Sequence, residues 1–221
     1  MELVSTTKIR SRISQRKIRR ILRMFSVDVN AVQIAELTGI NRNTVNRYLK
    51  IIRTVIAQYC EEQSPFSGVV EVDESYFGSR HVKGKRGRGA SGKTIVFGIF
   101  KRNGKVYTRI VLDVTRASLQ DVIKGKVTLD SVIHSDHWKA YNGLVDVGYM
   151  KHYRINHSIE YANSVTHING IESFWSFAKT RLSKFRGMNK QTFYLHLKES
   201  EFRFNHRHEN LYKLLLKLTH F

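Results

Sequence analysis

The chain has 221 residues, 41% of them hydrophobic, which is enough for one large domain or two small domains with buried cores. Its 38 lysines and arginines against 18 acidic residues give a formal net charge of +20, which favours a polyanionic partner: nucleic acid first, a membrane surface second. The single cysteine, Cys60, excludes an intrachain disulfide and a multi-cysteine zinc ribbon. No apolar run approaches the roughly 20 residues that cross a bilayer, and no signal-peptide pattern is present, so we expect a cytoplasmic protein with no membrane partner.

The N-terminal part of the chain has a helical pattern and a basic excess. Residues 7–25 place isoleucines at helical intervals among arginines and lysines, which predicts a basic helix. Two more helices are predicted at residues 29–37 and 41–58. Gly39 between them permits a tight turn.

This pair of helices resembles a helix-turn-helix. Asn41 can cap the second helix, and Val45 can pack back against the first. The second helix would be the recognition helix, with exposed side chains able to reach base edges or phosphates. A hairpin of helices used only for packing is the alternative, and the basic charge favours DNA binding. The candidate DNA-binding residues of this helix are Arg42, Asn43, Asn46 and Arg47.

The only proline of the chain, Pro65, lies where the pattern changes from helical to strand-like. We therefore predict a helix-turn-helix domain at residues 1–64 and a second domain at residues 65–221. In the second domain an Asn-Gly pair is a strong hairpin signal. Strands are predicted at residues 69–75, 94–100, 105–112, 131–136 and 149–155, and helices at residues 117–127, 137–144, 167–185 and 192–206.

A basic, glycine-rich segment separates the first two predicted strands. Residues 80–93 contain six basic residues, four glycines and no acid, which predicts a flexible loop. Such a loop either binds the phosphate backbone of DNA or is a solvent-exposed charged segment. The sequence favours neither interpretation over the other. Its candidate DNA-binding residues are Lys85, Arg86 and Arg88.

Three acids lie on separate predicted elements. Asp73 and Asp136 end strand-like runs, and Glu172 lies on the polar side of an amphipathic helix. Lys179 follows two turns later on the same side. For that helix alone, an ordinary solvated glutamate is the simpler explanation. Three carboxylates from separate elements, however, suit a divalent-metal site, because hard cations prefer oxygen ligands.

The order of elements and acids resembles the ribonuclease H-like fold of DDE transposases and integrases. Between Asp136 and Glu172 lie 35 residues (137–171), and Lys179 stands seven residues beyond the glutamate, as in that superfamily. More narrowly, sequence blocks from Val-Asp-Glu-Ser-Tyr-Phe-Gly, which contains Asp73, to Phe-Arg-Phe-Asn-His-Arg at residues 202–207 are similar to bacterial insertion-sequence transposases of the ISXO-like group. The fold class expected is therefore α/β: a ribonuclease H-like mixed sheet flanked by helices and preceded by a small all-α helix-turn-helix domain.

The resemblance implies a DDE-type DNA transposase that acts on the bacterial nucleoid. It would cleave and join double-stranded DNA at the terminal inverted repeats of a mobile element and at its target, as a homodimer or higher oligomer. Two Mg²⁺ (or Mn²⁺) ions, held by Asp73, Asp136 and Glu172, would activate water and then a DNA 3′-hydroxyl. Lys179 would contact a DNA phosphate. Asn169, three residues before Glu172, is the alternative third ligand, although it brings no charge to offset two cations.

Two other functions remain open from the sequence. A non-catalytic DNA-binding regulator or transposase remnant would keep the helix-turn-helix without the chemistry, and the presence of all three acids counts against it. A DNA nuclease or resolvase of the same fold would cut without joining. The sequence does not separate that nuclease from a transposase.

Overall fold

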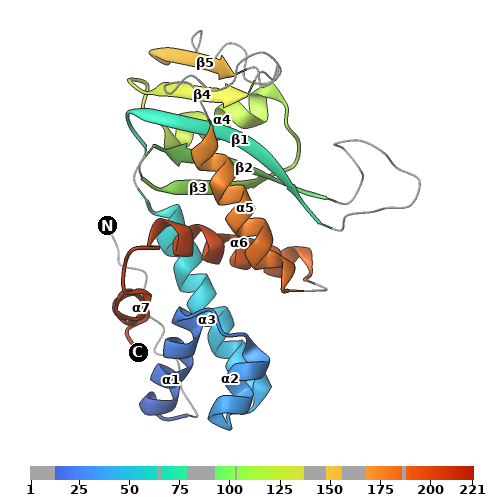
Figure 1. Ribbon diagram of the computed structural model, residues 1–221, viewed down its shortest axis with the longest axis vertical. Helices are drawn as coiled ribbons and strands as arrows, with labels where there is room; N and C mark the ends of the chain where they lie inside the picture. The colour runs from blue at the N-terminus through green and yellow to red at the C-terminus, as the bar shows by residue number, and fades with distance from the viewer. Residues whose placement is uncertain are drawn as a thin grey trace, which may run out of the picture. The chain divides into compact units, whose positions relative to one another are not determined.

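The computed structural model describes residues 13–63, 66–78, 93–102, 104–136, 148–155, 168–185 and 188–221 (Figure 1). The chain forms two compact units. One consists of Met1–Val55 together with His208–Phe221, and the other of Ile56–Arg207. Among the helices that the structure describes, none combines the length and the apolar character needed to cross a bilayer.

The first unit is helical. It contains α1 (Gln15–Ser26), α2 (Ala31–Thr38), the first part of α3 (Arg42–Glu61) and α7 (Leu211–Thr219). Apolar residues at helical spacing on each helix meet in one core, which explains why short helices are stable here. The core includes Ile18, Ile21, Leu22, Phe25, Ile34, Val45, Leu49, Ile52 and Leu215.

Caps define the start of α2 and the turn that leads from α2 to α3. The Asn30 side chain accepts from the backbone N–H of Gln33 at 3.0 Å, and the Gln33 side chain accepts from the backbone N–H of Asn30, so the two residues form a capping box. Helix α2 ends at Gly39, whose φ of 67° is readily available to glycine. Asn41 Oδ1 then accepts from the Asn43 N–H at 2.9 Å and starts α3. The predicted glycine turn and asparagine cap are both confirmed.

Helix α7 was absent from the sequence-based prediction, which ended with a helix at residues 192–206. Its N-cap is Asn210, which accepts from the Lys213 N–H at 3.0 Å, and its Leu215 is buried. Helix α7 packs against α1, and the Arg23 guanidinium lies 5.6 Å from the centre of the Tyr212 ring. The two ends of the chain therefore belong to one unit.

The second unit is built on a mixed sheet. The described strands are β1 (Val69–Phe77), β2 (Thr94–Lys101), β3 (Val106–Val111), β4 (Val132–Asp136) and β5 (Lys151–Ile155), in the order β3-β2-β1-β4-β5. Strands β1, β2 and β3 form an antiparallel meander, whereas β4 pairs parallel with both β1 and β5. The predicted meander and mixed α/β architecture are confirmed.

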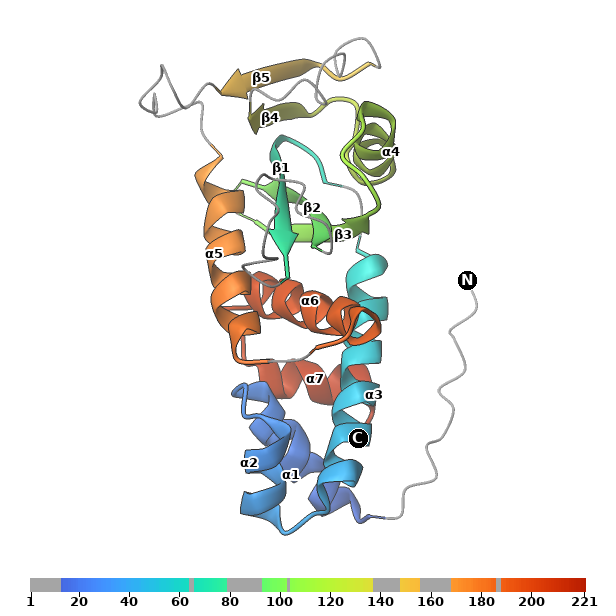
Figure 2. The same cartoon turned by 90° about the vertical axis from the view of Figure 1, so that its right-hand side faces the viewer.

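Helices cover both faces of this sheet (Figures 1 and 2). Helix α4 (Arg116–Lys126) lies on one face, and α5 (Asn169–Ser183) lies on the other, where α6 (Lys190–Asn205) packs beside it against β3. Because successive strand residues point to opposite faces, Val70 and Val72 of β1 pack with α4, while Phe77 packs with α5. Several predicted elements lie wholly or mostly outside the described residues: the start of the first helix, residues 80–92 of the basic loop and the helix at residues 137–144.

Candidate functional site

Two of the three predicted acids meet at the ends of neighbouring strands. The parallel register of β1 and β4 pairs Val72 with Ser135, so Asp73 and Asp136 follow side by side. Asp73, Glu74 and Asp136 each offer one carboxylate oxygen, and these oxygens all lie within 4.8 Å of one another. Glu74 was not among the residues predicted from the sequence for this site. The structure includes it in this group of half-buried acids, which we call the acid group.

The carboxylates of the acid group repel one another when they are ionised. The pKa of Asp73 is raised from 3.8 to about 7, mainly by burial and further by the charges of Glu74 and Asp136, against the lowering effect of a hydrogen bond from Trp175. A divalent cation would relieve this repulsion. Carboxylate oxygens at this spacing are also the donors that hard divalent cations prefer. The residues present therefore fit a site for such a cation.

Helix α5 carries the other predicted residues of the site. Asn169 is its first residue, Glu172 lies in its first turn and Lys179 follows two turns later, and all three side chains are exposed. The Lys179 Nζ lies 5.8 Å from the centre of the Phe77 ring. Among the residues that the structure describes, the acid group does not include Glu172. The helix is amphipathic, as predicted, and its buried side consists of Ile171, Phe174, Ala178 and Leu182.

Two polar contacts attach α5 to β1. The backbone N–H of Ile171 donates to Oε2 of Glu71 at 3.0 Å, and the indole N–H of Trp175 donates to Oδ2 of Asp73 at 2.9 Å. The first turn of α5, which includes Glu172, is therefore fixed to the strand that carries Asp73. Trp175 was not among the residues predicted from the sequence for this site, although its indole contacts the acid group.

The residues predicted to bind DNA fall into two sets. Arg42, Asn43, Asn46 and Arg47 are all exposed on α3, because Val45, Tyr48 and Leu49 occupy its buried side. The second set, Lys85, Arg86 and Arg88, lies outside the described residues. DNA binding by either set stays a prediction.

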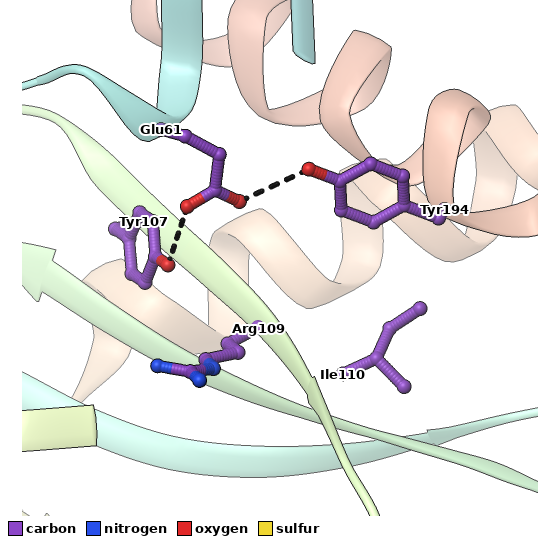
Figure 3. Close-up of a pocket in the computed structure, with 5 residues that line it drawn as sticks. All are labelled: Glu61, Tyr107, Arg109, Ile110 and Tyr194. Carbon is purple, nitrogen blue, oxygen red and sulfur yellow. Dashed lines mark hydrogen bonds between the residues drawn. The ribbon is translucent and has the colours of Figure 1, made fainter. Parts of the chain in front are cut away.

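A separate polar pocket of about 400 Å³ lies between the end of α3, strand β3 and helix α6 (Figure 3). Glu61 accepts hydrogen bonds from the hydroxyls of Tyr107 at 2.8 Å and Tyr194 at 3.2 Å, and it pairs with the Lys198 ammonium at 2.9 Å. Arg109 and Ile110 complete the lining. Because both carboxylate oxygens of Glu61 already accept hydrogen bonds from the chain, we interpret this cluster as structural.

The sequence of residues 65–205 matches the family described as the ISXO2-like transposase domain. An uncharacterized transposase-like protein of Haemophilus influenzae is 46% identical over 101 residues, which cover 46% of this chain and 81% of the relative. The chain therefore belongs to the ISXO2-like transposase family. The resemblance predicted from the sequence is confirmed.

Solved structures of the Mos1 transposase also resemble this chain weakly. The paired-end complex with the left transposon end matches with a TM-score of 0.31 and 12% identity, over 95% of this chain and 80% of that one. The Mos1 strand transfer complex matches with a TM-score of 0.30 and 12% identity, over 95% and 79% of the two chains. Similarity this weak does not support a family assignment. The assignment depends on the sequence matches alone.

Proposed function

We propose that this protein is a DDE-type transposase that cleaves and joins DNA at the inverted-repeat ends of an insertion sequence. The observation that carries the proposal is the acid group. In a chain of a transposase family, the parallel register of β1 and β4 places Asp73 beside Asp136 at the strand ends. The strand order β3-β2-β1-β4-β5 supports a ribonuclease H-like fold for this unit.

In this proposal the catalytic residues are Asp73, Asp136 and Glu172, which hold two Mg²⁺ (or Mn²⁺) ions. When bound, these ions supply Lewis-acid activation of water for nicking and of a DNA 3′-hydroxyl for strand transfer. Asp73 and Asp136 provide a half-buried pair of oxygen donors. Lys179, exposed on the same side of α5 as Glu172, provides a positive charge for a DNA phosphate.

The third ligand has three candidates. Glu172 is favoured because a carboxylate offsets cationic charge, and because its helical turn is fixed to β1 beside Asp73. Asn169 lies in the same turn and offers a neutral oxygen. Glu74 already lies in the acid group, but it is the immediate neighbour of Asp73 on one strand. Substitution of each residue separates these candidates.

The helical unit supports DNA binding by a helix-turn-helix domain within residues 1–64. The capped turn at Gly39 presents Arg42, Asn43, Asn46 and Arg47 on the exposed side of α3. The basic segment with Lys85, Arg86 and Arg88 would add contacts to the DNA backbone. The partners would be element ends and target DNA in the bacterial cytoplasm, bound by a homodimer or higher oligomer.

The binding role of α3 can be tested by substitution. Arg42→Ala or Arg47→Ala should weaken binding to element-end DNA by about 1–3 kcal/mol if the arginine contacts a base edge. Fluorescence anisotropy with end DNA and with scrambled DNA measures this change. Lys213→Ala on α7, also an exposed basic residue of the helical unit, is the matched control. Unchanged end-specific affinity in both arginine variants would argue against α3 as the recognition helix.

The catalytic proposal is tested by incubating the full chain with element-end DNA and a target plasmid in Mg²⁺. A transposase yields nicked ends and joined products, and both should vanish in EDTA. Nicking without joining would identify a nuclease or resolvase, and binding without nicking would identify a regulator or an inactive remnant.

A further inference from the structure

The contact between Trp175 and Asp73 links the core of α5 to the acid group. Trp175 is 5% exposed, and its indole N–H donates to Oδ2 of Asp73 at 2.9 Å. A carboxylate that accepts a directed hydrogen bond on one oxygen loses rotational freedom. Its other oxygen is then presented in a fixed direction. Such partners of metal-binding carboxylates orient them and tune their affinity.

The surroundings of the Trp175 ring are shaped for this contact. Gly98 of β2 is the cross-strand partner of Asp73, and a Cβ on Gly98 would lie 2.7 Å from Cζ2 of Trp175. The indole can therefore lie across β2 only because this position has no side chain. The rings of Phe77 and Phe174 pack against it, with centres 6.0 Å and 5.1 Å away. Packing thus fixes the indole in the position from which it reaches Asp73.

A second contact fixes the start of the same helix. Glu71 is fully buried two residues before Asp73, on the same face of β1. Its Oε2 accepts the Ile171 N–H at 3.0 Å, and its Oε1 accepts the Nε–H of Arg102 at 3.0 Å. A carboxylate at a helix N-terminus accepts from a free N–H and interacts favourably with the positive end of the helix dipole.

Glycine again allows the close approach. A Cβ on Gly170 would lie 2.1 Å from Cε1 of Phe100 and 2.9 Å from Oε2 of Glu71, so a larger residue there would push the first turn of α5 away from the sheet. The helix is thereby attached to β1 at positions 171 and 175. Glu172 lies between these two attachment points.

From these contacts we infer that Trp175 and Glu71 are positioning residues for the metal site. Trp175 orients the Asp73 carboxylate, and Glu71 sets the first turn of α5 so that Glu172 faces the same ions. Neither residue contacts DNA or metal in this scheme. The inference rests on the proposed function, because it assigns these residues a role in a site that Asp73 and Glu172 share.

The decisive variant is Trp175→Phe, which keeps an aromatic ring beside Phe77 and Phe174 but removes the N–H donor. Its matched control is Tyr149→Phe, which removes a buried donor on the α4 face of the same unit, where the Tyr149 hydroxyl bonds to the Val127 carbonyl at 3.4 Å. Mn²⁺ affinity, measured by electron paramagnetic resonance on the full chain, is the first readout. Thermal unfolding without metal reports any general loss of stability.

We expect Trp175→Phe to weaken Mn²⁺ binding about tenfold or more, with a thermal midpoint no lower than that of Tyr149→Phe. Tyr149→Phe should bind Mn²⁺ as the wild type does. In DNA cleavage, Trp175→Phe should lower kcat and leave KM for end DNA unchanged. Wild-type Mn²⁺ affinity in Trp175→Phe would overturn its role, as would equal losses of affinity in the two variants.

Glu71 is tested by a graded pair. Glu71→Gln keeps an oxygen for the Ile171 N–H and should lose less Mn²⁺ affinity than Glu71→Ala, which leaves that N–H without its acceptor. Equal affinities in the wild type and both variants would overturn the role of Glu71. Asp73→Asn separates this inference from the proposed function. If Mn²⁺ binding survives Asp73→Asn, the metal site itself is misplaced and both proposals fail. If Asp73→Asn abolishes binding while Trp175→Phe does not, only the positioning role fails.

Discussion

The α/β unit contains two charged clusters that differ in composition: one pairs opposite charges, and the other contains only acids. On α6, Lys198 is fully buried and pairs with Glu201 at 3.1 Å and with Glu61 at 2.9 Å. Although burial opposes it, these acids raise the pKa of Lys198 well above its usual value. The acid group gathers three carboxylates instead, and burial together with neighbouring acids raises the pKa of Asp73.

The difference distinguishes a cluster whose charges balance within the chain from one that needs a proton or a cation. Buried charges of opposite sign stabilise each other within the chain. Removing one partner leaves the other buried without compensation for its loss of hydration, which destabilises the fold. Carboxylates of the same sign destabilise the folded chain unless a proton or a cation is added. We therefore expect substitutions in the two clusters to act in opposite ways on stability and activity.

The largest expected effect is on chemistry. Asp73→Asn or Asp136→Asn should reduce DNA cleavage to background, because each removes a proposed metal ligand with little change in shape. Without metal, the same variants should unfold at the same temperature as the wild type or at a higher one, since like-charge repulsion is removed. Cleavage assays and calorimetry measure the two effects. A variant that cleaves DNA, or that unfolds well below the wild type, would contradict the comparison.

Lys198→Met should show the reverse pattern, a large loss of stability. It leaves the fully buried Glu201 without its cation and should lower the free energy of unfolding by about 3–5 kcal/mol. Urea denaturation measures the loss. Exposed Lys217→Met on α7 is the control and should change stability by less than about 0.5 kcal/mol. Similar losses in both variants would show that the α6 pair contributes little.

Substitution of the acids near α5 sharpens the comparison, because it identifies which of them act in catalysis. Glu172→Gln should eliminate nicking, while Asn169→Ala should leave a reduced but measurable rate. Glu74→Gln should also retain activity, since Glu172 is the favoured third ligand. Rates of end nicking in Mg²⁺ decide the matter. If Glu172→Gln were active and either Glu74→Gln or Asn169→Ala were inactive, the third ligand would be the residue whose substitution abolished nicking.

The smallest effect expected is a pH dependence of stability. Because the folded-state pKa of Asp73 is raised from 3.8 to about 7, its contribution to stability is complete below about pH 3.8 and is lost as pH rises through about 7. Mg²⁺ should therefore raise the thermal midpoint more at about pH 8 than at about pH 6, where it competes with the proton. Asp73→Asn should remove this difference, and an equal Mg²⁺ effect at both pH values would refute the assignment.

Sequence patterns were sufficient wherever a local signal determined the structure. The meander follows from its Asn-Gly hairpin, and the turn at Gly39 from its glycine and from the Asn41 cap. Asp73 and Asp136 meet because the ends of parallel strands share one edge of a sheet, a rule that needs no side-chain detail. Their proposed roles, and that of Glu172, stay predictions.

Features that depend on distant partners could not be predicted. In the sequence, Trp175 has the spacing of an ordinary core residue. Its indole reaches Asp73 only because Gly98 has no side chain to block it. The charges of α6 look like an exposed face until Thr108 and Glu61 are placed against them. Helix α7 is short, and its partner α1 lies at the other end of the sequence.

The membership of α7 in the helical unit has a consequence for synthesis. Helix α1 leaves the ribosome early, but its packing partner is made only after the whole α/β unit has been translated. At roughly 5–20 residues per second, that delay is on the order of 10–40 s. We therefore expect the helical unit, which carries the proposed DNA-binding residues, to be completed last, so that nascent chains still on the ribosome would bind element DNA poorly.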